Sequence, residues 1–372
     1  MTTSDKTKAT DMATPGGDNA AGSTAVSAEG THSPLSSTLR RGILIGAIVA
    51  GIALSFLFGW GLHPVGIIVL AAVIYMVTMF VVSRSREGGR HAVDRLVTAV
   101  VTTMFALAMV PLVSVTLGVL QKGKARMDAQ FFSNTMRNVI GDGGGAYHAI
   151  MGTLIITGIA TVVSVPIGIL AAIYLVEYGK KNRLSRALTF FVDVMTGIPS
   201  IVAGLFAFSL WLLIMGPGFK AGIVGATALI VLMIPTVVRN TEEMLRIVPH
   251  DLREASLALG VPRWLTIVKV VLPTALAGIA TGVTLAIARV IGETAPLLIT
   301  VGTADSWNVN PFDSRMATLP VFAYYQYMTP GTPPWPYLDR AWSSALVLIV
   351  IVMGLNIAAR LISKVFAPKA GR

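Results

Sequence analysis

The chain has 372 residues, of which 54% are hydrophobic and only 13% are charged. This composition excludes an ordinary soluble domain and predicts an all-α protein that crosses a membrane several times. The net charge of +11 would suggest nucleic-acid binding in a soluble protein, but cationic residues also collect in the cytoplasmic loops of membrane proteins. We therefore expect membrane lipid, and no nucleic acid, as a partner.

Several kinds of chemistry have no support in the sequence. The chain has no cysteine, which removes disulfides and thiolate metal sites, and its five histidines show no HExxH or clustered pattern. We therefore expect no metal site and no catalytic residue. A nucleotide-binding GxxxxGK[ST] motif is also absent, so no cofactor is expected on this chain, and an ATP-driven process would need the ATP and Mg²⁺ of a separate ATPase.

Residues 1–39 are rich in Ser, Thr, Gly and Ala without apolar periodicity, which predicts a disordered cytoplasmic tail. Eight apolar runs then approach or exceed the roughly 20 residues that a hydrocarbon core requires, so we expect eight transmembrane helices. They fall near 42–60, 64–83, 96–120, 148–176, 188–216, 222–238, 270–294 and 342–362. The chain thus divides into an N-terminal transmembrane region at 40–120 with about three spans, an external loop at 121–147, a transmembrane core at 148–366 and a cytoplasmic tail at 367–372. The third span is a candidate to enter the core.

The distribution of lysine and arginine predicts the orientation. With both termini in the cytoplasm, 21 of the 29 cationic residues lie on the cytoplasmic side and 7 lie outside, while Arg289 lies within a span. This asymmetry follows the positive-inside rule. It places residues 240–269 in the cytoplasm and the loop 121–147 outside, although four cations of that loop oppose the rule.

A polar stretch at 251–273 separates two of the apolar runs. Asp251 and Glu254 have the spacing of a capping box, which predicts a helix start. Gly260 then predicts a stop in the left-handed conformation, and Pro262 a second helix that meets the next apolar run at Pro273. We call this pair of short helices the elbow.

The helical spacing of the elbow predicts which side chains share a face. Leu252, Ala255, Ser256 and Leu259 recur at intervals of three and four residues, and Arg253 and Glu254 point away from them.

The elbow resembles the EAA loop of bacterial ABC-importer permeases. Glu254, Ala255 and Ser256 are followed after three residues by Gly260, and after nine more by Val270-x-Leu272-Pro273. In that family the loop is the coupling helix that sits in a cleft of an ATPase subunit. The resemblance therefore implies ATPase coupling for this set: Glu254, Ala255, Ser256, Leu259, Gly260 and Pro273.

Four further stretches resemble phosphate permeases of the PstA type within this family. They are Thr196–Phe206, Arg239–Pro249, Ala288–Leu298 and Asp339–Leu348. The resemblance implies a six-span core preceded by two additional N-terminal spans, in a bacterial plasma membrane. It also implies a non-catalytic permease subunit of an ATP-driven phosphate importer, whose partners are a second permease, an ATPase dimer and an extracytoplasmic phosphate-binding protein.

Two places in the spans are candidates for the substrate pathway. Gly197 and Pro199 are expected to break or kink the fifth span, and the freed backbone groups serve either a structural kink or a polar cavity. The resemblance favours the cavity and assigns the flanking Thr196 and Ser200 to the pathway. The charged run at 239–246 either forms pairs within its helix or contacts the ATPase.

Arg289 is the other candidate, since an arginine within a span needs a partner or water. Glu293 lies four residues on, so both side chains are expected on one helix face, as a structural ion pair or as a pair that opens for a phosphate anion. We favour the pathway for Arg289, Glu293 and the adjacent Thr294. Another oxyanion, such as sulfate or molybdate, remains an alternative substrate, and a secondary transporter is a less favoured class that would need no elbow.

The charge distribution generates a first testable prediction. Sidedness reporters should give a cytoplasmic signal at Arg90, Asn182, His250 and the C-terminus, and an external signal at Asp128, Phe219 and Trp335. Accessibility labelling of single-cysteine variants measures this, because the natural chain has no cysteine of its own. An external signal at His250 would overturn the orientation.

Overall fold

The computed structural model describes residues 35–59, 61, 64–179 and 182–366, so most of the predicted tail at 1–39 and the tail at 367–372 lie outside the described residues. All regular elements in the described part are helical. Seven of these helices are long and apolar enough to cross a membrane, and an eighth span is formed if the bent pair α6 (Arg183–Gly197) and α7 (Ser200–Met215) is counted as one. The predicted all-α fold with about eight spans is confirmed.

The chain forms two compact units whose boundary lies between Val113 and Ser114. The first unit contains α1 (Ser37–Leu57), α2 (Pro64–Arg86) and most of α3 (Gly89–Lys122). Gly51 lets α1 approach α2 closely, because a Cβ there would lie 2.8 Å from the backbone nitrogen of Ala71. The two N-terminal spans therefore pack as a tight hairpin.

Glu87 holds the turn between α2 and α3 of the first unit. Its carboxylate accepts hydrogen bonds from the Leu35 amide at 2.6 Å and the Ser83 hydroxyl at 2.8 Å, and Arg95 lies at 3.5 Å. These donors favour the ionised form, with the Leu35 amide contributing most, and lower the pKa of Glu87 to about 2. The start of α1 is thereby tied to the turn.

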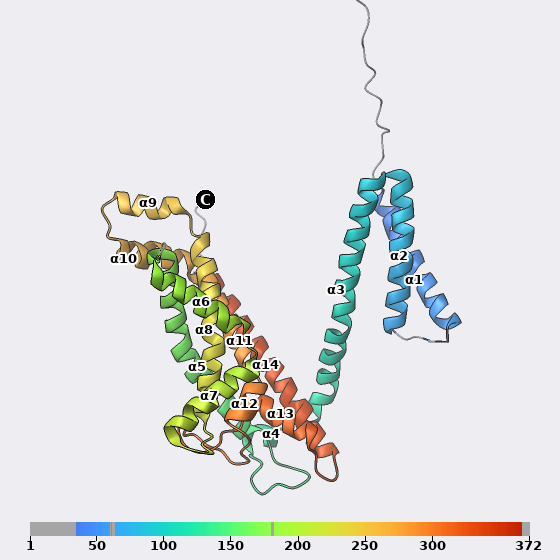
Figure 1. The fold of residues 1–372 in the computed structure, drawn as a ribbon. Coiled ribbons are helices and arrows are strands. Elements are labelled where there is room, and N and C mark those ends of the chain that lie inside the picture. Colours follow the sequence, from blue (N-terminus) through green and yellow to red (C-terminus); the bar gives the residue numbers. More distant parts are fainter. Residues whose placement is uncertain (1–34, 60, 62–63, 180–181, 367–372) are drawn as a thin grey trace, which may run out of the picture. The chain divides into compact units, whose positions relative to one another are not determined.

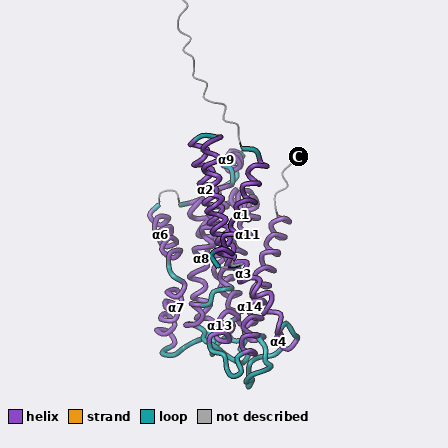
Figure 2. Tube along the Cα trace, turned by 90° about the vertical axis from the view of Figure 1, so that its right-hand side faces the viewer, coloured by secondary structure: helices purple, strands orange, loops and turns teal. Residues whose placement is uncertain are grey.

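The second unit contains the rest of the described chain (Figures 1 and 2). After the end of α3 and a 3₁₀ turn η1 (Gly123–Arg126), its elements are α4 (Ala129–Ser133), α5 (Tyr147–Ile173), η2 (Tyr174–Tyr178), α6, α7, α8 (Gly222–Ile247), α9 (His250–Ala258), α10 (Arg263–Thr266), η3 (Ile267–Val271), α11 (Leu272–Ile291), α12 (Ala295–Thr300), α13 (Leu319–Met328) and α14 (Trp335–Phe366). The short helices α9 and α10 lie at one end, here called the elbow end. Helices α4, α12 and α13 lie at the opposite, distal end.

Small residues allow the helices of the second unit to pack closely. A Cβ on Gly168 of α5 would lie 2.6 Å from the Val237 side chain of α8, and one on Gly204 of α7 would lie 2.7 Å from the Pro296 backbone of α12. Around these contacts, the buried core draws its residues mainly from α5, α8, α11 and α12. This packing holds in place the helices that carry the candidate pathway residues.

The predicted break of the fifth span is present. Helix α6 ends at Gly197, α7 begins at Ser200, and the two axes are bent by 111°. Pro199 adopts an extended backbone at the start of α7 and accepts the first hydrogen bonds of the helix through its carbonyl. The break therefore exposes the first backbone N–H groups of a new helix.

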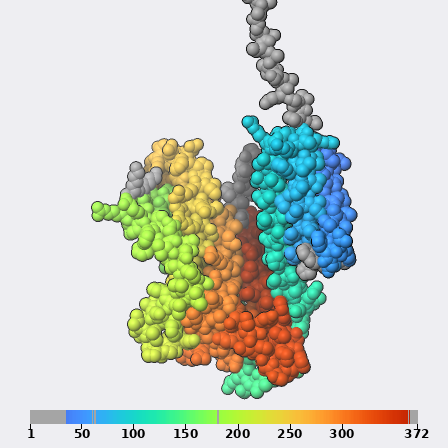
Figure 3. All heavy atoms as spheres, turned by 45° about the vertical axis from the view of Figure 1, so that its right-hand side comes forward, coloured from blue at the N-terminus to red at the C-terminus, as the bar shows by residue number. Residues whose placement is uncertain are grey.

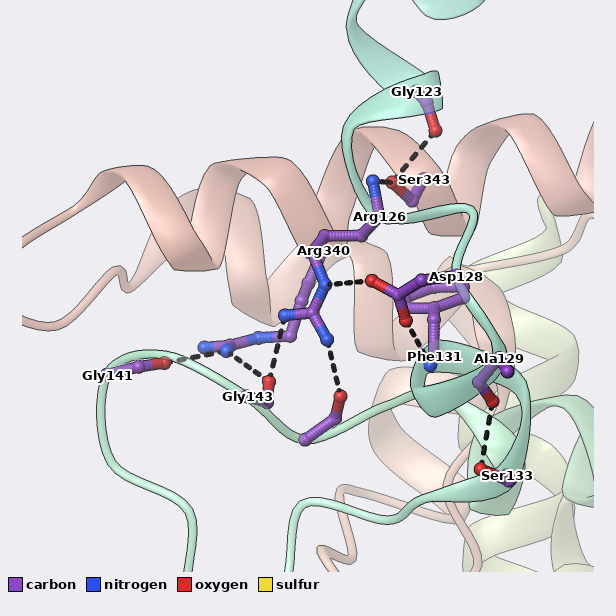
Figure 4. A network of polar contacts seen from close by, with 11 residues as sticks. Gly123, Arg126, Asp128, Ala129, Phe131, Ser133, Gly141, Gly143, Arg340 and Ser343 are labelled. Carbon is purple, nitrogen blue, oxygen red and sulfur yellow. Dashed lines mark hydrogen bonds and ion pairs between the residues drawn. The ribbon is translucent and has the colours of Figure 1, made fainter.

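Two arginines order the loop at the distal end (Figure 4). Arg126 pairs with Asp128 at 3.0 Å and donates to the carbonyls of Gly143 and Gly144. Arg340, which is fully buried, donates to the carbonyls of Gly141 and Gly143. The glycine-rich segment thus wraps around two guanidinium groups. The pKa of Asp128 is lowered, mainly by the hydrogen bond that its carboxylate accepts from the Phe131 amide and also by its ion pair with Arg126.

Candidate coupling elbow and transport pathway

The elbow has the predicted helix–turn–helix shape, with shifted helix starts. Helix α9 begins at His250 after Pro249, without a side-chain capping bond, so Asp251 lies in the first turn and the predicted capping box with Glu254 is wrong. Pro262 precedes α10 instead of occupying its first position. Helix α8 continues to Ile247, so it covers the first part of the cytoplasmic segment 240–269 in which the coupling elbow was predicted.

Gly260 makes the turn as predicted. Its φ of +77° lies in the left-handed region, and the Val261 amide beyond it donates to the Ser256 carbonyl at 3.3 Å. A Cβ at Gly260 would meet no heavy atom within 4 Å. The demand for glycine is therefore conformational and not steric.

The side of α9 that packs against the protein carries Arg253. This residue, predicted to face away from the apolar side chains of the helix, has a side chain only 12% exposed. Its guanidinium lies 2.9–3.0 Å from Glu177 Oε1 of η2, and it also donates to the carbonyls of Leu245 and Val248. A guanidinium with donors for several acceptors can be buried only where those acceptors converge, as they do here.

Two more contacts complete the attachment of the elbow. The hydroxyl groups of Ser256 and Thr266 are buried and lie 2.9 Å apart, joining α9 to α10. Arg263 donates to the Glu177 carbonyl and stacks over the Tyr178 ring at 5.2 Å. Glu177 therefore receives one arginine from each helix of the elbow, and we call Glu177, Arg253 and Arg263 the clamp.

The remaining predicted coupling residues form the free surface of the elbow. Glu254, Ala255 and Leu259 are exposed, and Leu259 is 84% exposed. Leu252, Leu257 and Trp264 add large exposed apolar side chains to the same two helices. Below α9 lies a hollow of about 660 Å³ lined by Glu254, Leu257 and the clamp, among others. In the space-filling view the yellow segment that holds α9 forms the upper end of this unit (Figure 3).

Pro273 produces no interruption. A π-helical turn, η3, joins α10 to α11, so Arg263–Ile291 is one continuous helix that contains Pro273. Asp193, Arg239, Glu242 and Arg246 form an ion-paired network between α6 and α8. The charged run at 239–246 is thus engaged in pairs within its own chain.

The Arg289–Glu293 pair is not formed as predicted. Helix α11 ends at Ile291, and Glu293 lies in the three-residue break before α12, so the i, i+4 relation of one helix does not apply. Among the described residues, the Arg289 guanidinium has no ion pair or hydrogen bond, and its side chain is exposed. Arg289 is available to groups outside this chain.

The other predicted pathway residues lie at helix ends. Thr196 is exposed near the end of α6 and donates its hydroxyl to the Val192 carbonyl. Ser200 is the first residue of α7, and Thr294 precedes α12. Within the described chain, no hydrogen bond or ion pair joins Arg289 to any of these three side chains.

The sequence and the fold of this chain are similar to those of known transport proteins. Residues 164–372 match a family described as the binding-protein-dependent transport system inner membrane component. This chain belongs to that family. It is therefore a multi-pass membrane protein and a transport permease component.

The similar proteins agree with this membership. Phosphate transport system permease protein PstA 1 of Mycobacterium tuberculosis is 47% identical over 263 residues, covering 70% of this chain and 85% of that protein. PstA of Mycobacterium leprae is 44% identical, covering 74% and 90%. A bacterial ABC transporter involved in alginate import shares the fold, with a TM-score of 0.52 and 13% identity, covering 73% of this chain and 96% of the other.

The turn at Gly260, between α9 and α10, generates a prediction. Gly260→Val should disfavour the left-handed turn by about 1–2 kcal/mol and weaken both ATPase association and substrate uptake. Gly260→Asn is the matched control, because asparagine tolerates this conformation better. Co-purification with the ATPase and uptake by cells measure both effects. Normal uptake by the valine variant would exclude a role for the turn.

The clamp generates a second prediction. Arg253→Met leaves Glu177 buried and unpaired, so the free energy of unfolding should fall by about 3–5 kcal/mol. Adding Glu177→Gln should restore the amount of folded protein, but not substrate-stimulated ATP hydrolysis, because α9 then has no ion pair to η2 and only the Arg263 contact of α10 with the Glu177 carbonyl remains. Thermal unfolding and ATPase assays of the assembled transporter distinguish the two. Full coupling in the double variant would show that the clamp is only structural.

Proposed function

We propose that this chain is the permease subunit of an ATP-driven phosphate importer. It does no covalent chemistry itself. It forms the translocation pathway with a second permease subunit and receives phosphate from an extracytoplasmic binding protein. ATP and Mg²⁺ act on a separate ATPase dimer that the elbow contacts, which places the elbow and both termini in the cytoplasm. The single observation that carries the proposal is the exposed Arg289 inside a membrane-spanning helix, where its guanidinium has no ion pair or hydrogen bond with any described residue.

Arg289 belongs to an exposed stripe on α11. Thr281, Leu285 and Arg289 follow each other at intervals of four residues and are all exposed. Residues at this spacing share one helix face. A charged side chain facing lipid at mid-span costs roughly 2.5–3.5 kcal/mol on insertion scales. The stripe is therefore expected to face water or another protein chain, as it would if a second permease subunit and the pathway lay against it.

The chemistry of Arg289 fits a phosphate ion. A guanidinium presents a planar set of donors that matches two phosphate oxygens at once. Because no group of the described chain occupies these donors, Arg289 can replace part of the water that phosphate loses on entry. Glu293 and Thr294 follow in the break after α11, where a carboxylate near the arginine would help to release the anion.

The break before α7 offers a second polar element. Ser200 begins a helix of 16 residues, whose N-terminus carries partial positive charge and unsatisfied N–H groups. Thr196 uses its hydroxyl hydrogen on Val192 and can only accept a further hydrogen bond. Ser200 is therefore the better phosphate donor of the two.

The elbow supplies the coupling in this proposal. Leu252, Leu257, Leu259 and Trp264 are exposed at the elbow end, and burying such side chains in an ATPase cleft would be favourable by about 25 cal/mol per Å² of apolar area. The clamp lies directly behind this surface. Movement of the ATPase would thus reach α5 and α11 through ion pairs and a continuous helix.

Arg289 tests the proposal directly. Arg289→Ala should reduce phosphate uptake about 100-fold or more, since two charge-assisted hydrogen bonds contribute roughly 3 kcal/mol or more. Membrane abundance and ATPase association should not change, because Arg289 has no described partner to leave unpaired. Arg360→Ala, which removes an exposed arginine of α14, is the matched control and should transport normally.

Labelled phosphate uptake, measured with sulfate and molybdate as competitors, distinguishes the outcomes. Wild-type uptake by Arg289→Ala would remove Arg289 from the pathway. Sulfate or molybdate that competes with labelled phosphate as strongly as unlabelled phosphate does would show that the permease transports oxyanions in general. Uptake by the chain without any ATPase would indicate a secondary transporter.

A further inference from the structure

A groove of about 640 Å³ lies at the distal end of the second unit, where the end of α3 and η1 meet the start of α14. Its lining combines cationic, aromatic and apolar side chains. The residues used below are Lys122, Lys124, Trp335, Leu338, Asp339 and Trp342. The groove lies outside both the elbow and the proposed pathway. It also contains two of the four cations that oppose the positive-inside rule.

The cations of the distal loop fall into two groups. Arg126 is engaged by Asp128 and by the carbonyls of the glycine-rich segment, so its charge is used in ordering the loop. Lys122 and Lys124 are exposed and form no ion pair among the described residues. Lys122 Nζ lies 4.9 Å from the centre of the Trp342 ring, which directs it into the groove. The two ammonium groups are therefore available to an anion.

The depth of the groove matches the headgroup zone of a bilayer. Lys122 ends the apolar helix α3, and Trp335 begins α14. From Trp335 to Trp342 the helix rises about 10 Å, which is enough to cross an interfacial layer of roughly 5–7 Å on one side of the hydrocarbon core. Tryptophan is enriched in that layer. Leu117 and Leu120, which precede Lys122 on α3, are exposed, and we expect them to face acyl chains.

We propose that this groove binds an anionic phospholipid with a hydroxylated headgroup, such as phosphatidylglycerol. Lys122 and Lys124 hold the phosphodiester, and Trp335 and Trp342 pack against the glycerol region. Asp339 accepts a hydrogen bond from a headgroup hydroxyl. The carboxylate of Asp339 also distinguishes this ligand from inorganic phosphate, because a doubly charged ion near a carboxylate is repelled more strongly than a singly charged phosphodiester.

The site accounts for two of the four cations that oppose the charge rule. Lysines at the distal end work against the favoured orientation, and neither lysine is used in a salt bridge within the described chain. A lipid phosphate bound in the groove neutralises the charges of Lys122 and Lys124. The proposal rests on these contacts and on the position of the groove, and it holds whichever oxyanion the permease transports.

The test compares lipid binding to the purified full-length permease, reconstituted in nanodiscs or released from detergent for native mass spectrometry. We expect phosphatidylglycerol to bind more tightly than phosphatidylcholine. Lys122→Ala with Lys124→Ala should weaken phosphatidylglycerol binding about 25-fold, from about fivefold for each lysine near an anionic headgroup. Arg137→Ala, which removes an exposed cation of the same loop outside the groove, should change binding less than twofold.

A second variant separates charge from folding. Lys122→Arg with Lys124→Arg keeps both charges and should retain binding within about threefold. Equal phosphatidylglycerol binding by the alanine double variant and the natural chain would overturn the proposal. Displacement of the lipid by 10 mM inorganic phosphate would also overturn it, by showing that the groove is a phosphate site. Equal affinity for phosphatidylglycerol and phosphatidylcholine would show that headgroup charge is not recognised.

Discussion

The attachment of α9 to the second unit depends on one buried ion pair, between Glu177 of η2 and Arg253 of α9. Burying two charges is costly unless their remaining hydrogen-bonding groups are satisfied. Here Arg253 also donates hydrogen bonds to the two carbonyls at the end of α8. The pair therefore joins the ends of α5 and α8 to the elbow at one point. An elbow held only by its apolar side chains could slide or rotate, because apolar contacts are not directional.

The two ends of this unit use arginine differently. At the elbow end, Arg253 and Arg263 connect the elbow to η2 and to the end of α8. At the distal end, Arg126 and Arg340 donate to the carbonyls of a glycine-rich loop that has no regular structure of its own. Arg289 differs from all of these, because its guanidinium has no ion pair or hydrogen bond in the described chain.

The sequence predicts the spans and the turns well, because apolar length and glycine conformation are local properties. Gly260 and the break at Gly197–Pro199 both have the expected geometry. The orientation of α9 is not predictable in this way. Its leucines mark an apolar face, but that face is exposed, and the buried face is set by Glu177, which lies 76 residues away. Helical spacing also placed Glu293 beside Arg289, although the helix ends first, at Ile291.

The π-helical turn η3 lies between the elbow and the membrane-spanning part of α11, so it sets the direction in which the side chains of α11 point relative to the elbow. Because Arg263–Ile291 is continuous, each residue added to or removed from it would turn everything beyond by about 100°. Loss of one residue at η3 would leave the clamp in place but swing Arg289 off the exposed stripe toward the packed helices. The number of residues between Gly260 and Arg289 therefore matters to the structure separately from their identities.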